Sequence, residues 1–340
     1  MGTTKGPGPG DPAPGGATAD GVAAVGGGET ALMLAIARRY YREDQSKVDI
    51  ARDLGISRFQ VARLLQEARR TGLVRIEIGS PGHVDEDLSG RVAERLGLAR
   101  VIVVEAHPSA PQSTFDFVGA ALAAELERVV TEGASVGLAW SRATPAMVRS
   151  LRRLPPCTVV QLSGAIYPPA GLPGSVEVTR EVAASAGGTA HILYAPLVVP
   201  DPETADGLRR QPEIAAALAR ADHLDVAVLS IGAWRTGSSA VYDLLGASDR
   251  ERLSATGTVG EVSGRLLGPD GRPVITDLDD RVIGATLDQL QAADLRLTSA
   301  SGAERRTATV AAVRAGLVST LIIDDALAQA LIDGEPLLHP

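Results

Sequence analysis

The stretch KVDIARDLGISRFQVARLL, Lys47 to Leu65, has the pattern of two short helices joined by a tight turn. Ala51 is small where a second helix must cross closely, and Gly55 can adopt the positive φ that such a turn needs. Ser57 stands at the N-cap position of the second helix, and Val61 faces inward from that helix. The stretch therefore predicts a helix-turn-helix, a motif whose second helix lies in the major groove of DNA.

Basic and polar side chains occupy the outward face of the predicted second helix. We expect DNA contacts from a set of residues around the turn: Lys47, Ser57, Arg58, Gln60, Val61 and Arg63. The alternative is a compact helical pair with no DNA partner, and the basic outward face argues against it.

The distribution of charge also favours a DNA-binding segment. The net charge of the chain is −8, but residues 29–79 contain ten Lys or Arg against seven Asp or Glu, a balance of +3 that leaves −11 for the rest. Affinity for nucleic acid depends on local positive charge that meets phosphates, and an acidic remainder discourages indiscriminate binding. A small DNA-binding domain attached to a larger acidic domain fits this asymmetry.

Composition limits the class of protein. A chain of 340 residues is long enough for two or three domains, and only 3% of the residues are aromatic, so the core must consist of Val, Leu, Ile and Ala. A single cysteine, Cys157, excludes a disulfide framework and a cysteine-cluster metal site, and we expect no metal and no cofactor. No apolar stretch approaches a membrane span and no secretory signal is present, so we expect a cytoplasmic protein without membrane contact.

Four segments follow from composition and periodicity. Residues 1–28 are rich in Gly, Pro, Ala and Thr, which predicts a disordered tail. Residues 29–80 form the helix-turn-helix domain, in which Leu73–Ile78 alternates as a strand of a wing would. Residues 81–99 contain a linker helix that could carry a dimer contact or pack on the next domain. Residues 100–340 form a larger domain that would bind an effector.

In the larger domain, short apolar runs alternate with helical stretches. The expected strands are Val101–Val104, Ser135–Leu138, Thr158–Leu162, Ile192–Leu197, Val226–Ile231 and Leu321–Ile323. This alternation predicts an α/β fold, a doubly wound parallel sheet covered by helices on both faces. Ligands bind such sheets at the carboxyl ends of the strands.

Loops at the expected strand ends offer groups for a ligand. Gly137–Thr144 brings two hydroxyls and a guanidinium to the start of a helix, which suits a phosphate or carboxylate but also fits an ordinary capped turn. Gln161–Ala165 and Gly232–Gly237 add small residues and a hydrogen-bonding side chain each. Glu261 lies between apolar residues, where its carboxylate needs a sugar hydroxyl or a salt-bridge partner. Arg305 could hold a phosphate or be a solvated charge.

Six segments together resemble the SorC-type family of sugar-binding transcriptional regulators, over about residues 32–332. They are DIARDLGISRFQVARLLQEARRTGLVRIEI (49–78), VGLAWSRAT (136–144), VVQLSGA (159–165), VGEVSGRLLGPDGRPV (259–274), LDDRVIGATLDQL (278–290) and AVRAGLVSTLIIDDALAQALI (312–332). The resemblance implies an effector domain similar in fold to sugar-phosphate isomerases and glucosamine-phosphate deaminases, which serves as a sensor and not as a catalyst. It also implies homodimers or homotetramers on palindromic operators.

The resemblance further implies which residues contact a sugar phosphate: Ser141, Arg142, Thr144, Ser163, Gly164, Glu261 and Arg305. Three departures from the family pattern bear on the identity of the effector, and one of them is Ser301-Gly302 in place of the usual double glycine. The first loop usually has Gly-Trp-Gly-Arg-Thr where this chain has residues 139–144, AWSRAT, and Arg305 replaces a common lysine. An arginine binds phosphate bidentately and with a different geometry.

We therefore predict a DNA-binding regulator of carbohydrate metabolism, not an enzyme, whose operator affinity is modulated by a sugar phosphate or related metabolite. One alternative is an isomerase- or deaminase-like enzyme with a helical appendage. The histidines are scattered, however, and no acid/base pair can be assigned among Asp279, Asp280, Asp324 and Asp325. The other alternative is a regulator that responds to an unphosphorylated sugar or polyol.

Overall fold

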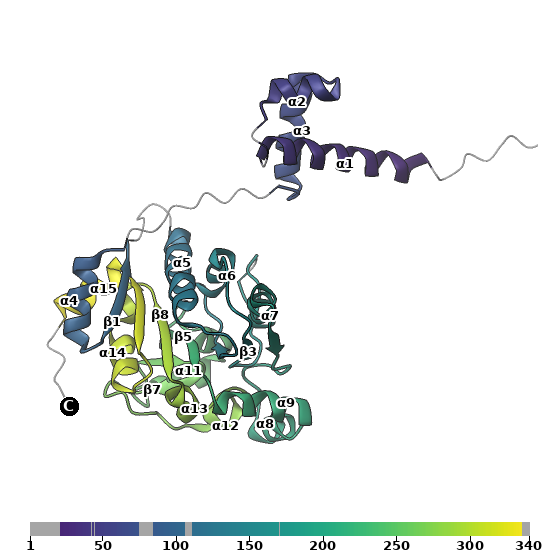
Figure 1. The fold of residues 1–340 in the computed structure, drawn as a ribbon. Helices are drawn as coiled ribbons and strands as arrows, with labels where there is room; N and C mark the ends of the chain where they lie inside the picture. Colours follow the sequence, from purple (N-terminus) through teal and green to yellow (C-terminus); the bar gives the residue numbers. More distant parts are fainter. Residues whose placement is uncertain are drawn as a thin grey trace, which may run out of the picture. The chain divides into compact units, whose positions relative to one another are not determined.

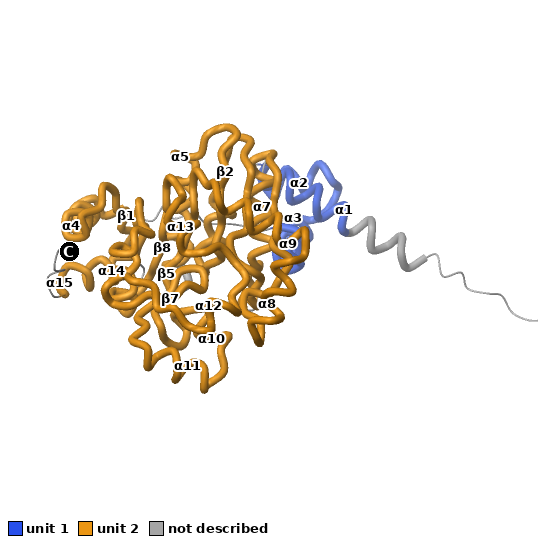
Figure 2. The backbone as a smooth tube through the Cα atoms, turned by 90° about the horizontal axis from the view of Figure 1, so that it is seen from below, with its two compact units in different colours: residues 1–80 blue, residues 81–340 orange. Residues whose placement is uncertain are grey.

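The computed structural model of the chain describes residues 21–41, 43, 45–74, 84–105, 111–169 and 171–334. The chain forms two compact units, residues 1–80 and residues 81–340, which Figure 2 draws in blue and orange. The described part of the first unit is helical, and that of the second combines helices with a large sheet.

The smaller unit consists of α1 (Gly21–Tyr41), α2 (Lys47–Leu54) and α3 (Arg58–Arg70). Its core packs Ile36 of α1 against Ile50 of α2 and Val61 of α3, all without exposed surface. Gly55 ends α2 with a φ of 65°, and the Ser57 hydroxyl caps α3. These features confirm the helix-turn-helix part of the expected fold.

The start of α1 corrects the expected extent of the N-terminal tail. The tail was expected to include residues 21–28, but α1 begins at Gly21. The backbone continues the helix to Gly21 from the half of α1 that packs in the core through Met33, Ile36 and Ala37. Residues 1–20 and the expected wing strand beyond Val74 lie outside the described residues.

A parallel sheet with strand order β1-β9-β8-β5-β2-β3-β4 forms the centre of the larger unit. Its strands are β1 (Arg100–Val104), β2 (Ser135–Leu138), β3 (Thr158–Gln161), β4 (Thr189–His191), β5 (Val226–Ala233), β8 (Leu295–Ala300) and β9 (Thr320–Asp324). The antiparallel hairpin of β6 (Gly260–Val262) and β7 (Arg265–Leu267) pairs with the end of β5. The expected α/β fold with a parallel sheet is confirmed.

Helices cover both faces of this sheet. One face packs on α5 (Pro111–Val129), α6 (Thr144–Ser150) and α7 (Ser175–Ala186). The other packs on α4 (Glu86–Leu96), α13 (Leu287–Ala292), α14 (Arg306–Arg314) and α15 (Asp325–Asp333). The connections contain α8 (Pro202–Arg209), α9 (Pro212–Ala219), η1 (Arg220–Asp222), α10 (Ala240–Leu244), α11 (Ala247–Ser254), α12 (Asp277–Arg281) and η2 (Ala303–Arg305).

Strand β1 illustrates why both faces need cover. Val101 and Val103 belong to one core and Ile102 and Val104 to the other, because successive side chains of a strand point to opposite faces. A strand with apolar side chains on both faces is typical of a buried parallel sheet.

The expected linker helix, α4, packs on the larger unit. Leu88 and Val92 are buried in the core of one sheet face, and α4 lies beside β1 and α15 (Figure 1). This packing is the second of the two roles that the sequence left open.

The expected strand at Ile192–Leu197 is wrong. The strand of this region is β4, which ends at His191, and the residues after it have irregular backbone. Leu193 and Ala195 are buried, but the Ala195 carbonyl accepts a hydrogen bond from the backbone N–H of Ala165 at 2.7 Å, outside the ladder of β4. The apolar run here reflects burial, and its pairing is limited to an isolated bridge between Ala165 and Pro196.

Strand β8 has no counterpart among the expected strands because its interior contains polar residues. The Thr298 hydroxyl donates to the Leu317 carbonyl at 2.7 Å, and the Ser299 hydroxyl donates to the Leu229 carbonyl at 3.3 Å. Hydrogen bonds of this kind allow hydroxyls to be buried, so a central strand can lack a continuous apolar run.

An ion cluster joins α5 to β1. The buried Glu125 carboxylate accepts from Arg100 Nε at 2.9 Å and from Arg128 Nη2 at 2.6 Å. Burial alone would raise the pKa of Glu125, but the two guanidinium groups outweigh it and hold the pKa below the ordinary value. Because the pKa is lower in the folded state than in the unfolded state, the cluster stabilises the fold above the ordinary glutamate pKa and loses this effect as the pH falls through the folded-state value.

We expect Glu125→Gln to reduce the free energy of unfolding of the larger unit by about 1–3 kcal/mol at pH 7, because hydrogen bonds to a charged group are lost. The difference from the wild type should shrink as the pH falls below the ordinary glutamate pKa of 4.5 and through the lower pKa of the folded state. Trp140 and Trp234 are the only tryptophans and both lie in the larger unit, so urea unfolding followed by tryptophan fluorescence reports on this unit. Glu132→Gln, at an exposed position, is the control. A difference that does not change with pH would contradict this role of Glu125.

Candidate functional site

The order of the strands creates a ligand site at the middle of the sheet. After β2 the chain moves through β3 to β4, whereas after β5, the neighbour of β2, it moves the other way through β8 to β9. Connections that leave neighbouring strands in opposite directions open a crevice at the carboxyl ends of the strands. A cavity of about 360 Å³ lies there, lined by residues from the ends of β2, β3, β5 and β8.

The structure brings most of the predicted effector residues together in this cavity. The lining includes Ser141, Arg142, Ser163, Glu261 and Arg305. The other two predicted residues, Thr144 and Gly164, do not line it, and their hydrogen bonds and packing indicate structural roles.

Thr144 fixes the shape of the loop after β2. Its hydroxyl accepts from the Ser141 N–H at 3.1 Å and donates to the Ser141 carbonyl at 2.9 Å. The Ser141 hydroxyl in turn accepts from the N–H groups of Ala143 and Thr144, each at 3.2 Å. The N–H groups of Ser141, Ala143 and Thr144 are therefore already satisfied, and the positive charge of this loop comes from Arg142.

Gly164 allows two chain segments to cross closely. A side chain here would collide with the backbone carbonyl of Pro196, and the Gly164 N–H donates to the Ile283 carbonyl at 2.9 Å. The glycine is required by this crossing, beside the irregular segment that follows β4.

Glu261 places a buried carboxylate against the cavity. Its Oε1 accepts from the Ser239 hydroxyl at 2.9 Å, and its Oε2 accepts from the Gly264 N–H at 2.9 Å. Burial raises the pKa of Glu261, although both hydrogen bonds and the charge of Arg305 act in the opposite direction. These partners exclude the surface salt bridge considered as the alternative for this residue.

Two guanidinium groups make one part of the cavity positive. Arg305 donates to the Ser238 carbonyl at 3.2 Å and pairs with Glu304 at 2.5 Å. Burial lowers the pKa of Arg305, which Glu304 partly offsets and Arg142 reinforces through its own charge. Arg142 stacks on Phe115, with its Cζ 5.7 Å from the ring centroid, and has no ion pair within the described ranges. This arrangement can accept an anion.

Several lining side chains have no counterpart among the predicted residues. They are the hydroxyls of Ser238, Ser239, Ser263 and Ser301 and the rings of Phe115 and Tyr167. Ser263 has a left-handed φ of 53°, and its buried Oγ lacks a hydrogen-bond partner in the described part of the chain. A strained backbone and an unsatisfied hydroxyl at a cavity are typical of a ligand contact. The sequence signal is the pair Ser263-Gly264 between two short runs, the pattern of a two-residue hairpin turn.

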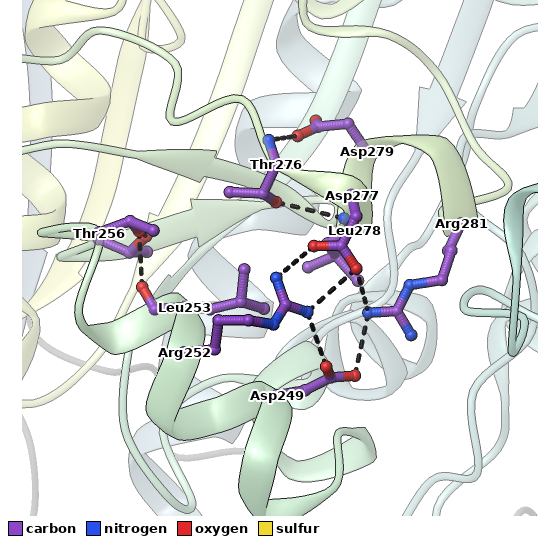
Figure 3. A network of polar contacts seen from close by, with 10 residues as sticks. Asp249, Arg252, Leu253, Thr256, Thr276, Asp277, Leu278, Asp279 and Arg281 are labelled. Atoms are coloured by element: carbon purple, nitrogen blue, oxygen red, sulfur yellow. Dashed lines mark hydrogen bonds and ion pairs between the residues drawn. The ribbon is translucent and has the colours of Figure 1, made fainter.

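A second cavity of about 910 Å³ adjoins the first and shares Ile166, Tyr167, Pro168, Leu197 and Leu244 with it. An ion-pair network lies at its side and ties α11 to α12 (Figure 3). Asp249 accepts from Arg252 at 2.7 Å and from Arg281 at 2.9 Å, and Asp277 pairs with Arg281 at 3.3 Å. The guanidinium groups of Arg252 and Arg281 are therefore paired with carboxylates, whereas the guanidinium of Arg142 has no ion pair among the described residues.

The smaller unit presents most of the candidate DNA-binding residues to solvent. Arg58, Gln60 and Arg63 are exposed on α3, and Lys47 is half-buried at the start of α2. Val61 is fully buried in the core of the unit. Its inclusion among the DNA contacts is therefore wrong, because its side chain is enclosed by the three helices and cannot reach a base.

Ser57 and Gln60 form a capping box at the start of α3. The Ser57 hydroxyl accepts from the Gln60 N–H at 3.1 Å, and Gln60 Oε1 accepts from the Ser57 N–H at 3.0 Å. This arrangement satisfies backbone donors at the helix start. It also engages one lone pair of the Gln60 amide oxygen, and the second lone pair and the NH2 group remain available to a base.

Phe59 is an exposed aromatic residue that is absent from the predicted set. Its side chain is 77% exposed, and the Cζ of Arg58 lies 5.5 Å from its ring centroid. Arg58, Arg63 and Arg69 have no ion pair among the residues described for this unit. The outward surface of α3 therefore combines free positive charge with one aromatic ring.

The described residues include no group of three or more His, Cys, Asp or Glu side chains placed to hold a metal ion. Within the same ranges, no helix has the length and apolar character to cross a membrane. Of the carboxylates considered for catalysis, Asp279 belongs to the capping box of α12 and Asp324 caps α15. Both are therefore engaged in structure.

Comparisons with known proteins cover almost the whole chain. The family model described as "Putative sugar-binding domain" matches residues 83–333. The transcriptional regulator LsrR of Klebsiella pneumoniae is 28% identical over 311 residues, which cover 89% of this chain and 93% of the relative. The deoxyribonucleoside regulator of Bacillus subtilis is 26% identical over 308 residues, with 89% and 97% covered.

A solved structure agrees with the fold. The crystal structure of the full-length sorbitol operon regulator SorC from Klebsiella pneumoniae matches with a TM-score of 0.67 at 23% identity and covers 90% of this chain and 100% of that chain. Because the family model spans most of the larger unit and the relatives align along nearly their full length, the chain belongs to the SorC family of sugar-binding transcriptional regulators.

Proposed function

We propose that the protein is a DNA-binding regulator of carbohydrate metabolism whose operator affinity changes when a sugar phosphate, or a related metabolite with an anionic group, binds the larger unit. One observation carries the proposal: the guanidinium of Arg142, which has no ion pair among the described residues, lies at the same cavity as Arg305 and the buried Glu261.

The charges of the cavity assign different ends of such a ligand to different residues. Arg142 and Arg305 bind the phosphate, since charge-assisted hydrogen bonds between guanidinium and phosphate are strong and directional. Glu261 cannot lie beside a phosphate without repulsion, and its carboxylate suits the hydroxyl groups of a sugar. The serine hydroxyls of the lining can donate to or accept from the same hydroxyl groups.

An unphosphorylated sugar or polyol is the alternative effector. It would leave the guanidinium of Arg142, which has no ion pair among the described residues, without an anion at the cavity, which makes it the weaker candidate. An isomerase or deaminase activity would require a positioned acid/base pair. No histidine of the described chain lines the cavity, and Asp279 and Asp324 cap helices.

Regulation requires that the effector prefer one state of the protein over another. A coupling free energy of about 1–3 kcal/mol between effector and DNA would change operator affinity roughly 5- to 150-fold. A homodimer or homotetramer on a palindromic operator would place one recognition helix in each half-site.

Arg142→Ala should weaken the binding of a phosphorylated effector about tenfold or more, because a hydrogen bond to a charged group contributes roughly 1.5–3 kcal/mol. Its effect on the stability of the free protein should be small, since Arg142 stacks on Phe115 and has no described ion pair. Calorimetric titration with sugar phosphates and the matched free sugars measures both the affinity and the preference for phosphate.

The control variant for this experiment is Arg149→Ala. Arg149 lies on α6, the helix that follows the loop of Arg142, but it pairs with Asp116 at 2.6 Å and does not line the cavity. It should bind the sugar phosphate like the wild type. Equal affinity of the wild type for a sugar and its phosphate would favour the unphosphorylated effector, and turnover of a sugar phosphate would favour the enzyme.

Arg58→Ala and Arg63→Ala should each weaken DNA binding and flatten its salt dependence. Each lost phosphate contact lowers the slope of log affinity against log salt by about 0.9. Fluorescence anisotropy with the promoter DNA next to the gene, at several salt concentrations, measures this slope.

Arg70→Ala provides the matched control on the same helix. Arg70 is paired with Glu67 at 2.5 Å, so its removal changes the formal charge of α3 by the same amount as the other two substitutions but takes away no unpaired guanidinium. If reversal of both charges at Arg58 and Arg63 leaves DNA retention at low salt unchanged, α3 does not bind DNA and the proposed function is wrong.

A further inference from the structure

Phe59 is an exposed aromatic residue in the first turn of α3. Single exposed apolar side chains are common on protein surfaces and need no explanation by themselves. Phe59, however, is the second residue of α3 and follows the N-cap Ser57 by two positions. In helix-turn-helix proteins the N-terminal residues of this helix contact the edges of the bases.

The outward face of α3 is suited to enter a groove with Phe59 leading. Phe59, Arg63 and Gln66 follow one another at intervals of four and three residues, so they share one face of the helix, and all three are exposed. Ala62, on the same side, is small and does not obstruct an approach. The core residues, among them Val61, lie on the opposite face.

The charge around Phe59 favours DNA over an apolar protein surface. The guanidinium of Arg58 lies over the ring, and neither Arg58 nor Arg63 forms a salt bridge in the described part of the unit, although Arg63 also interacts electrostatically with Glu67, the partner of Arg70. An apolar partner would bury these charges without compensation, which is strongly unfavourable. The major groove has phosphates along both rims and the methyl groups of thymine on its floor.

The capping box restricts Gln60 but not Phe59. Gln60 Oε1 accepts from the Ser57 N–H, which holds this side chain against the helix start, although its second lone pair and its NH2 group can still contact a base. The exposed ring of Phe59 takes no part in the capping box, so it is also available to distinguish bases.

We propose that Phe59 is a specificity-determining residue whose ring packs against the C5 methyl group of a thymine in the operator. This inference rests on the proposed function of the protein as a DNA-binding regulator. The methyl group distinguishes thymine from cytosine in the major groove, and an aromatic ring is one of the apolar groups that recognise it.

The test exchanges single thymines for deoxyuridine, which pairs identically and lacks only the methyl group. Binding sequences are first selected with the full-length wild-type protein from a pool of random duplexes, so no operator needs to be known. Each thymine of a selected duplex is then replaced in turn, and the dissociation constant is measured by fluorescence anisotropy at one salt concentration. The wild type should bind about fourfold more weakly when one particular thymine of a half-site is replaced, the factor that corresponds to about 0.8 kcal/mol for one buried methyl group.

Phe59→Ala should bind the thymine and deoxyuridine duplexes equally, and Phe59→Leu should keep part of the difference because it keeps an apolar contact. Both variants should fold, since the ring lies outside the core of the unit, and circular dichroism checks this. Arg63→Ala is the control, which should weaken binding to both duplexes by the same factor.

The outcomes separate this inference from the proposed function. If the wild type binds DNA but no thymine replacement weakens binding, or if Phe59→Ala keeps the preference for thymine, Phe59 does not read the methyl group, whereas the proposed function stands. If the wild type selects no duplex even at low salt, the proposed function fails and this inference fails with it.

Discussion

The adjacency of β2 and β5 is the constraint on which the effector site depends. These parallel strands pair side by side, yet the chain leaves them towards opposite edges of the sheet. Their following loops must therefore diverge, and the space between them is the cavity. The β6–β7 hairpin then pairs with the end of β5 and places Glu261 against the cavity wall. Strand order thus determines the location of the site, and the loops supply its chemistry.

Within this site, burial separates two kinds of charged group. Glu261 is enclosed, so burial disfavours its charged form and raises its pKa, although the hydrogen bonds from Gly264 and Ser239 act in the opposite direction. Arg142 keeps access to the cavity and is balanced by no described carboxylate. A ligand with one anionic end and several hydroxyl groups satisfies both requirements at once, whereas a purely anionic ligand would leave the carboxylate without a suitable partner.

Much of the fold follows from local pattern, but some elements depend on partners that are distant in sequence. The helix-turn-helix is predictable because Gly55, Ser57 and Val61 each have a local reason for their position. β8 is not, because Thr298 becomes compatible with burial only through a carbonyl that lies beyond α14 in the sequence. The apolar run after β4 shows the opposite situation: its sequence resembles a strand, but Leu193 and Ala195 are buried against residues of α8 and α9 and against Ile283.

The same distinction explains which site residues were predictable. Residue type shows what a side chain can bind, but only the folded structure shows whether its atoms are already in use. Thr144 and Gln60 both have side-chain groups that could form hydrogen bonds with a ligand. The Thr144 hydroxyl is bonded within its own loop, and the Gln60 amide oxygen accepts a hydrogen bond at the start of its own helix. Arg142 and Phe59 are not engaged in this way. Arg142 lines the cavity, and Phe59 lies exposed on α3. A polar group that already has a hydrogen-bond partner adds little to the free energy of ligand binding, whereas an unpaired charge or an exposed ring adds more. Recognition in both units should therefore depend on side chains that have no hydrogen bond or ion pair within the protein.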